Sequence, residues 1–320
     1  MTVTANPDNP TSPTRVLRRE GRSFHWAALF LRRRDAQDAA RLYAFCRMVD
    51  DLADGTASET ADAALAGIER DMAAGHSGDS TVQAFLHMAA RRDLPLAAAS
   101  GLIQGVRGDL SAPMLADTAE LTRYSYRVAG TVGLMMCPLL GVHDRRAFPF
   151  AIDLGIAMQL TNIARDVQED ARRERRYLPA SLLGAAIPPR RLVNPEPAAA
   201  QAVYTGIQRL LDLADLYYRS ADRGMVFIPP RARLAIITAR RVYAGIGERI
   251  RALGPTGYWQ GRVTVSRAGK ARRTGQAAAQ FARTATRLDL QPPCHDPSLH
   301  TAIADLPGAN PLAARPDETF

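Results

Sequence analysis

The sequence predicts an all-α protein. Alanine and leucine are its most abundant apolar residues, and alternating runs of β-branched residues, which would indicate strands, are scarce. Hydrophobic residues make up 47% of the 320 residues, so the bulk of the chain is globular rather than disordered. Glycine and proline lie mostly in the gaps between helical segments.

The N-terminal part contains a tail, a short helix and a long helix. Residues 1–14 are polar, and we expect this tail to be disordered. The run 21–24 leads into the short helix, where Ser23 can either cap the helix or offer its hydroxyl and nearby N–H groups to an anion. The long helix covers about residues 35–54.

This long helix has a polar stripe. Tyr43, Arg47, Asp50 and Asp54 recur at spacings of four, three and four, so they share one helix face, and apolar residues fill most other positions. A carboxylate pair at such spacing is usually a solvated face. The stripe alone is therefore weak support for a functional site.

Helices are expected next at about 58–75, 80–91 and 95–107, followed by one from about 116 that runs on through 123–141. In the last of these, Ala129, Gly130 and Gly133 permit close approach by another helix or an apolar ligand. Tyr124 lies one turn before Val128. It is either a structural tyrosine or, in a metal–diphosphate cavity, a phenol that stabilises a cation or moves a proton.

A second polar stripe lies on the helix predicted for 151–178. Gln159, Asn162, Asp166 and Asp170 follow at spacings of three, four and four, among apolar neighbours. Two carboxylates one turn apart repel each other, and a hard divalent cation with oxygen ligands would relieve this repulsion. Two such stripes, more than a hundred residues apart, suggest two helices that face each other across a metal-holding cavity.

The remainder is predicted to be helical at about 198–223 and 230–252, after a proline-rich connector at 185–197. A loop at 254–261 precedes a final basic helix that begins with 262–266. We expect a main domain over 15–290 and a disordered tail over 291–320.

The net charge of +9 fits an anionic partner. An anionic membrane surface and an anionic small substrate remain open, whereas nucleic acid is disfavoured because no recognised binding motif is found. A dense basic cluster follows the second stripe and is either a solvated face or a diphosphate attractant. Its members are Arg172, Arg173, Arg175 and Arg176.

The remaining features indicate a soluble or peripheral protein. Cys46, Cys137 and Cys294 are odd in number and lack metal-ligand spacing, as expected for reduced thiols in a cytosol. The N-terminus does not resemble a signal peptide. The longest apolar run, Thr131–Val142, is too short to span a bilayer.

Several segments together resemble the trans head-to-head prenyl synthases, a family that includes phytoene, squalene and dehydrosqualene synthases. The resemblance covers about residues 15–272 in colinear order, and the RSFH and VAGTVGLMM segments are most similar to bacterial 15-cis-phytoene synthases. The matching segments are RSFHWAALFL, LYAFCRMVDDLAD, LIQGVRGDL, YSYRVAGTVGLMMCPLLG, DLGIAMQLTNIARDVQEDARRERRYLP, LADLYYRSADRGM and ARRVYAGIGERI.

The resemblance implies an isoprenoid-synthase fold, a single helical bundle around a central active-site cavity. It implies a prenyltransferase that joins two geranylgeranyl diphosphates head to head, through prephytoene diphosphate, to 15-cis-phytoene in carotenoid biosynthesis. The alternative is a squalene, dehydrosqualene or presqualene diphosphate synthase that uses farnesyl diphosphate. A non-catalytic relative that acts in assembly or binding is a third reading, which the two intact acidic motifs disfavour.

The resemblance also implies roles for individual residues. Tyr124 matches the tyrosine assigned to cation stabilisation or proton removal. The implied Mg²⁺ ligands, whose carboxylates also count as catalytic, are Asp50, Asp54, Asn162, Asp166 and Asp170. The residues implied to orient the diphosphates are Ser23, Tyr43, Arg47, Gln159, Arg165, Tyr243 and Arg262.

The implied cofactor is Mg²⁺, with Mn²⁺ as an alternative ion, and a phytoene synthase would need no NADPH. The implied partners are prenyl diphosphates, a membrane surface and a downstream carotenoid enzyme, with no nucleic acid. The expected location is the cytoplasm, with peripheral attachment to the inner face of the membrane.

Overall fold

The computed structural model describes residues 13–19, 21–55, 57–285 and 292–310, and it contains no β-strand within these ranges. The prediction of an all-α protein is therefore confirmed. The α-helices are α1 (Pro13–Arg19), α2 (Arg22–Ala28), α3 (Arg33–Gly55), α4 (Ser58–Ala74), α5 (Ser80–Arg92), α6 (Leu96–Gly108), α7 (Thr118–Ser125), α8 (Thr131–Leu139), α9 (Phe148–Arg172), α10 (Ala180–Leu183), α11 (Arg190–Val193), α12 (Pro197–Gly224), α13 (Pro230–Tyr258) and α14 (Arg267–Ala285). Shorter helical turns are η1 (Asp109–Ser111), the π-helix η2 (Tyr126–Gly130), η3 (Arg145–Ala147), η4 (Met225–Phe227) and η5 (Pro297–Ile303).

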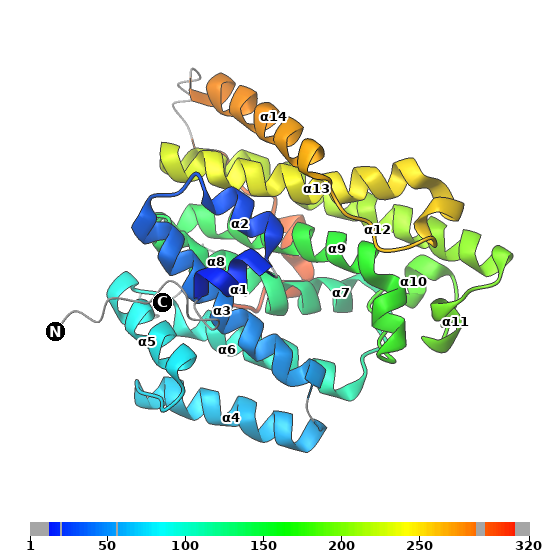
Figure 1. Ribbon diagram of the computed structural model, residues 1–320, viewed down its shortest axis with the longest axis horizontal. Coiled ribbons are helices and arrows are strands. Elements are labelled where there is room, and N and C mark those ends of the chain that lie inside the picture. The colour runs from blue at the N-terminus through cyan, green and yellow to red at the C-terminus, as the bar shows by residue number, and fades with distance from the viewer. Residues whose placement is uncertain (1–12, 20, 56, 286–291, 311–320) are drawn as a thin grey trace.

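Helix α9 forms the centre of the bundle. It packs against α8, α11, α12, α13 and η2, and Ile156 and Leu160 on it are fully buried. Each such side chain contributes about 1.5–3 kcal/mol of hydrophobic stabilisation. Figure 1 shows α9 in the middle of the molecule, α14 along the outer side of α13, and α4 at the opposite edge.

Small residues allow α8 and η2 to lie very close to α9. A Cβ atom at Gly133 would lie 2.3 Å from the carbonyl oxygen of Ala151, and one at Gly155 would lie 2.3 Å from that of Ala129. Real Cβ atoms essentially never approach an oxygen this closely, so both positions require glycine. The predicted close approach along the 129–133 stretch is confirmed.

Several predicted boundaries differ from the observed ones. The helix expected from about 116 to 141 is divided by the π-helix η2, and α9 ends at Arg172 rather than near residue 178. The chain turns there because Glu174 adopts a left-handed conformation (φ 58°), after which Arg176 pairs with Met114 in an isolated bridge. The basic cluster 172–176 is therefore a turn at the end of α9.

Two further local predictions change. Gly21, not Ser23, is the N-cap of α2, which begins at Arg22. The loop expected at 254–261 is largely helical, because α13 continues to Tyr258 through a break at Gly254 (φ 65°). The last long helix begins at Arg267 instead of 262.

The predicted tails have different outcomes. Residues 1–12 of the N-terminal tail lie outside the described residues, and the next two belong to α1. Within the predicted C-terminal tail, residues 292–310 pack against the bundle, with Ile303 fully buried. The prediction that this stretch is disordered is wrong for residues 292–310. They make buried apolar and polar contacts that the composition of the stretch does not reveal.

Candidate active site

A cavity of about 850 Å³ lies between α3, α9 and α13. The cavity is lined by every residue to which the family resemblance gives a metal, substrate or catalytic role: Ser23, Tyr43, Arg47, Asp50, Asp54, Tyr124, Gln159, Asn162, Arg165, Asp166, Asp170, Tyr243 and Arg262. Of the basic cluster, Arg173 and Arg175 line it, whereas Arg172 and Arg176 are not among its lining residues. The two polar stripes thus meet at one space, as the spacing predicts. The roles of the individual residues remain predictions.

The α3 wall presents two aspartates in different environments. Burial raises the pKa of Asp50 to about 7; Arg47 opposes this shift, whereas Asp109 and Asp54 add to it. The Asp54 carboxylate accepts hydrogen bonds from Arg173 and from Arg175 (Nη1–Oδ1 2.8 Å). The turn at the end of α9 therefore brings its arginines to the acidic stripe of α3.

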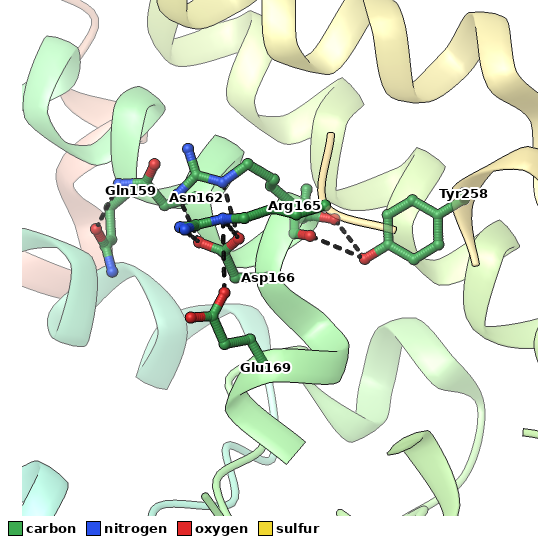
Figure 2. Close-up of polar contacts among 8 residues, drawn as sticks. Gln159, Asn162, Arg165, Asp166, Glu169 and Tyr258 are labelled. Carbon is green, nitrogen blue, oxygen red and sulfur yellow. Dashed lines mark hydrogen bonds and ion pairs between the residues drawn. The ribbon is translucent and has the colours of Figure 1, made fainter. Parts of the chain in front are cut away.

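The α9 wall places Asp166 between two arginines. Arg165 donates to it through Nε (2.8 Å) and Nη2, and Arg262 approaches from the loop before α14 (Nε–Oδ1 3.1 Å). Figure 2 shows the Asp166 carboxylate directed at Arg165, with Glu169 one turn along the helix. The helix is kinked at this residue (φ −108°, ψ 16°), and the hydroxyl of Tyr258 donates to the carbonyl oxygen of Ala164 beside the kink (2.8 Å).

Asp170 lies one turn beyond Asp166. Burial raises its pKa to about 8, and the negative charges of Asp166 and Glu169 add to the shift. Asp50 and Asp170 therefore hold protons near neutral pH unless a cation compensates their charge. Carboxylate oxygens and the side-chain oxygen of Asn162 are ligands that hard divalent cations prefer, so the donor set of this cavity fits Mg²⁺.

Two further acidic residues line the cavity, Glu169 and Asp109, and the sequence analysis selected neither. Asp109 in η1 accepts a hydrogen bond from Tyr177 (2.6 Å) and a longer one from Tyr124 (3.3 Å). The two tyrosine rings stack with centroids 4.6 Å apart. Burial raises the pKa of Asp109 to about 6 and raises that of Tyr124 above its usual range.

The sequence analysis found Tyr124 but not its two partners, because Asp109 is a single acidic residue with no periodic partner and Tyr177 follows the turn that ends α9. The only sequence signal for Asp109 is its place in the segment LIQGVRGDL.

One part of the cavity lining is basic and aromatic. Phe24 of α2 contacts the rings of Tyr243 (centroids 5.0 Å apart) and Tyr43 (6.1 Å). Arg47 pairs with Asp51 on the same helix (2.5 Å). Additional cationic side chains that line this part are Arg19, Arg267 and Lys270. Planar guanidinium groups match phosphate oxygens, so this end of the cavity can receive an anionic, phosphate-bearing ligand.

The lining also includes apolar side chains, among them Val128, Ile163 and Ile246. The cavity therefore combines acidic, basic and apolar side chains in one lining. Such a space can hold a diphosphate at its polar end and exclude water from a hydrocarbon chain.

Comparisons with known proteins agree with this geometry. The family model for squalene/phytoene synthase matches residues 17–269. The 15-cis-phytoene synthase of Paracoccus sp. (strain N81106 / MBIC 01143) is 40% identical over 268 residues, which cover 80% of this chain and 86% of that protein. The phytoene synthase of Pseudescherichia vulneris is 34% identical over 287 residues, covering 85% and 92%. Among solved structures, a dehydrosqualene synthase in complex with ligand is similar with a TM-score of 0.75 and 26% identity, covering 85% of this chain and 95% of that one.

Proposed function

This chain belongs to the squalene/phytoene synthase family and is an enzyme of the prenyltransferase class, and from this premise we propose that it makes 15-cis-phytoene. It would join two geranylgeranyl diphosphates head to head, through prephytoene diphosphate, for carotenoid biosynthesis. The 40% identity to a 15-cis-phytoene synthase over most of both chains is the observation that supports this product most directly. The meeting of two acidic stripes at one cavity supports the reaction type.

The ligands that would hold Mg²⁺, or Mn²⁺ in its place, are Asp50, Asp54, Asn162, Asp166 and Asp170. When bound, the ions supply charge that neutralises the leaving diphosphate. The two buried carboxyls with raised pKa support this assignment, because their ionisation at neutral pH needs a compensating cation.

The arginines would exchange partners when substrate binds. Arg173 and Arg175 hold Asp54, and Arg165 and Arg262 hold Asp166. With Asp54 and Asp166 engaged as metal ligands, these four guanidinium groups would be available to diphosphate oxygens. The diphosphate groups would also be oriented by Gln159, Ser23, Tyr43, Arg47 and Tyr243.

Tyr124 would act at the reacting carbons. Its high pKa keeps the phenol neutral, so its oxygen can stabilise a nearby allylic cation. In the final deprotonation, the phenol oxygen takes a proton from the hydrocarbon cation while its own proton passes to Asp109, 3.3 Å away. Tyr177 holds the other oxygen of Asp109 and fixes its orientation.

Product analysis tests the proposal. Purified protein with Mg²⁺ receives geranylgeranyl or farnesyl diphosphate separately, with and without NADPH, and the extracted hydrocarbons are identified. We expect a C40 product from geranylgeranyl diphosphate that is independent of NADPH. A C30 product from farnesyl diphosphate alone would assign the chain to the squalene or dehydrosqualene branch instead. Asp50→Ala is the matched inactive control.

We also propose a peripheral position on the inner face of the cytoplasmic membrane, where the insoluble product would pass to a downstream carotenoid enzyme. One stretch, Arg145–Arg172, has the length and hydropathy of a membrane span, but 67% of its apolar window is buried in the bundle. The support for peripheral contact is the turn between α2 and α3, where Leu29 is 64% exposed and three exposed arginines follow at 32–34.

This surface is suited to anionic lipid. A triple variant, Arg32→Glu, Arg33→Glu and Arg34→Glu, should lose sedimentation with vesicles that contain phosphatidylglycerol, while phosphatidylcholine vesicles bind neither protein. Binding of the triple variant to phosphatidylglycerol vesicles that equals binding of the wild type would exclude this surface.

A further inference from the structure

A second polar cluster lies away from the cavity, between α9 and the C-terminal segment 292–310. Asp153 of α9 is fully buried, and each of its carboxylate oxygens faces one histidine. The distances are 2.8 Å from Oδ2 to Nε2 of His295 and 2.7 Å from Oδ1 to Nε2 of His300. The ligand atoms of the three side chains all lie within 4.8 Å of one another.

A neutral imidazole cannot satisfy both hydrogen-bond contacts of His300. Its Nδ1 lies 2.8 Å from the carbonyl oxygen of Ala309, and its Nε2 faces the Asp153 carboxylate. Both partners are acceptors, but a neutral imidazole has only one N–H group. A neutral His300 that donates to Ala309 therefore directs a lone pair at a carboxylate. Since this imidazole is only 2% exposed, a second proton or a metal ion must lie between them.

We infer that Asp153, His295 and His300 form a binding site for Zn²⁺. Two imidazole nitrogens and one carboxylate oxygen are a donor set that zinc accepts, with a fourth position left for water. Donation of the Nδ1 proton to a backbone carbonyl is the contact that usually orients a metal-bound histidine. Zinc bonds of about 2.0–2.2 Å place ligand atoms about 3.3 Å apart, so the two histidine–aspartate contacts would open by about 0.5 Å.

A metal ion also suits the charges better than two extra protons. The rings of His295 and His300 lie with centroids 4.3 Å apart, so two imidazolium ions would repel each other. Zinc binds both as neutral ligands. His295 is further held by an edge contact to the ring of Phe150 (5.2 Å), which fixes its direction.

This site is separate from the proposed Mg²⁺ site. Asp153 and Asp166 are thirteen residues apart on α9, which corresponds to about 20 Å along the helix axis. Its nitrogen ligands favour zinc over Mg²⁺, which prefers oxygen. The histidines also lie beyond residues 17–269, the part matched by the family model.

Zinc at this position would fasten the C-terminal segment to the bundle. The segment already contacts it through Tyr217, whose hydroxyl donates to Leu299 (2.8 Å), and Tyr126, whose hydroxyl donates to Pro307 (2.6 Å). A metal that joins α9 to η5 adds a strong link between residues about 140 positions apart in sequence.

Metal analysis of the full-length, tag-free protein tests the inference. After dialysis against buffer with micromolar Zn²⁺ and millimolar Mg²⁺, we expect about one zinc per chain. His295→Ala and His300→Ala should each reduce the content at least about tenfold. His143→Ala, which removes an exposed histidine outside the cluster, should retain it. Substitution with Co²⁺ should give the visible absorption of a four-coordinate site.

Hydrogen exchange of residues 297–303 gives a second readout. Zinc should slow exchange in this segment in the wild type and in His143→Ala, but not in His295→Ala. His295 lies nearer the surface than Asp153, so this variant decides the question if substitution of His300 impairs folding. The inference would be overturned if the wild type contained no more zinc than His295→Ala and if zinc did not change its hydrogen exchange. The cluster would then be held by protons only.

Discussion

Binding of Mg²⁺ should release protons, in an amount that the two buried carboxyls determine. Asp50 and Asp170 have pKa values raised to about 7 and about 8. At pH 7 the first is about half protonated and the second about nine-tenths protonated, so ionisation on metal binding releases about 1.4 protons per chain. The release should rise to about 1.9 protons at pH 6 and fall to about 0.1 at pH 9.

Isothermal titration calorimetry in two buffers of different ionisation enthalpy measures this number directly. Asp170→Asn removes the larger contribution and should leave about 0.5 proton at pH 7. The pKa shift of Asp50 arises mainly from burial, with smaller effects of Arg47, Asp109, Asp54 and Asp51, and Asp170 is not among its causes. Asp212→Asn, an exposed carboxylate far along α12, is the control and should leave the release unchanged. A release near zero at pH 7, or one that does not vary between pH 6 and pH 9, would refute the assignment of these residues as metal ligands.

Three further predictions concern stability and catalysis. The carboxyls of Asp50 and Asp170 bind protons more tightly in the folded chain than in the unfolded chain, where acidic groups ionise near pH 4. The free energy of unfolding of the metal-free protein should therefore fall by roughly 3–5 kcal/mol as the pH rises from 5.5 to 8.5. Thermal denaturation should show this loss, and saturating Mg²⁺ should largely remove it. Gly155→Ala would force a Cβ to within 2.3 Å of a carbonyl oxygen of η2 and should cost about 3 kcal/mol or more in chemical denaturation. By contrast, a Cβ at Gly67 would make only an ordinary contact with the end of the Arg70 side chain (3.8 Å), so Gly67→Ala should stabilise by up to about 1 kcal/mol. Tyr124→Phe keeps the ring stack but removes the hydroxyl and should lower kcat about 10²-fold with little change in KM. Tyr204→Phe, whose hydroxyl bonds the backbone of α13, should retain kcat, and equal activity of the two variants would exclude a chemical role for Tyr124.

The polar stripes of α3 and α9 were predictable because helical periodicity alone places their side chains on one face. Asp109 was not, since its function depends on where a turn brings Tyr177. That turn is set by a left-handed residue, Glu174, at a position where the apolar pattern predicts further helix. Local periodicity does not report such a conformation, which the bridge between Arg176 and Met114 holds in place.

The contacts of the C-terminal segment 292–310 could not be predicted from sequence periodicity either. Asp153 interrupts a run of apolar residues on α9, and a carboxylate buried there must have partners. The sequence therefore contains a sign that something polar covers this helix, but its partners, His295 and His300, lie in a short stretch without periodicity, about 140 residues away. The two kinds of acidic residue on α9 differ in what satisfies them. Burial favours the protonated form of both carboxyls, but the contacts with His295 and His300 outweigh it and lower the pKa of Asp153. At Asp170 the charges of Arg173 and Arg175 do not outweigh burial and the neighbouring carboxylates, so its pKa is raised to about 8 and its ionisation at neutral pH needs an added cation.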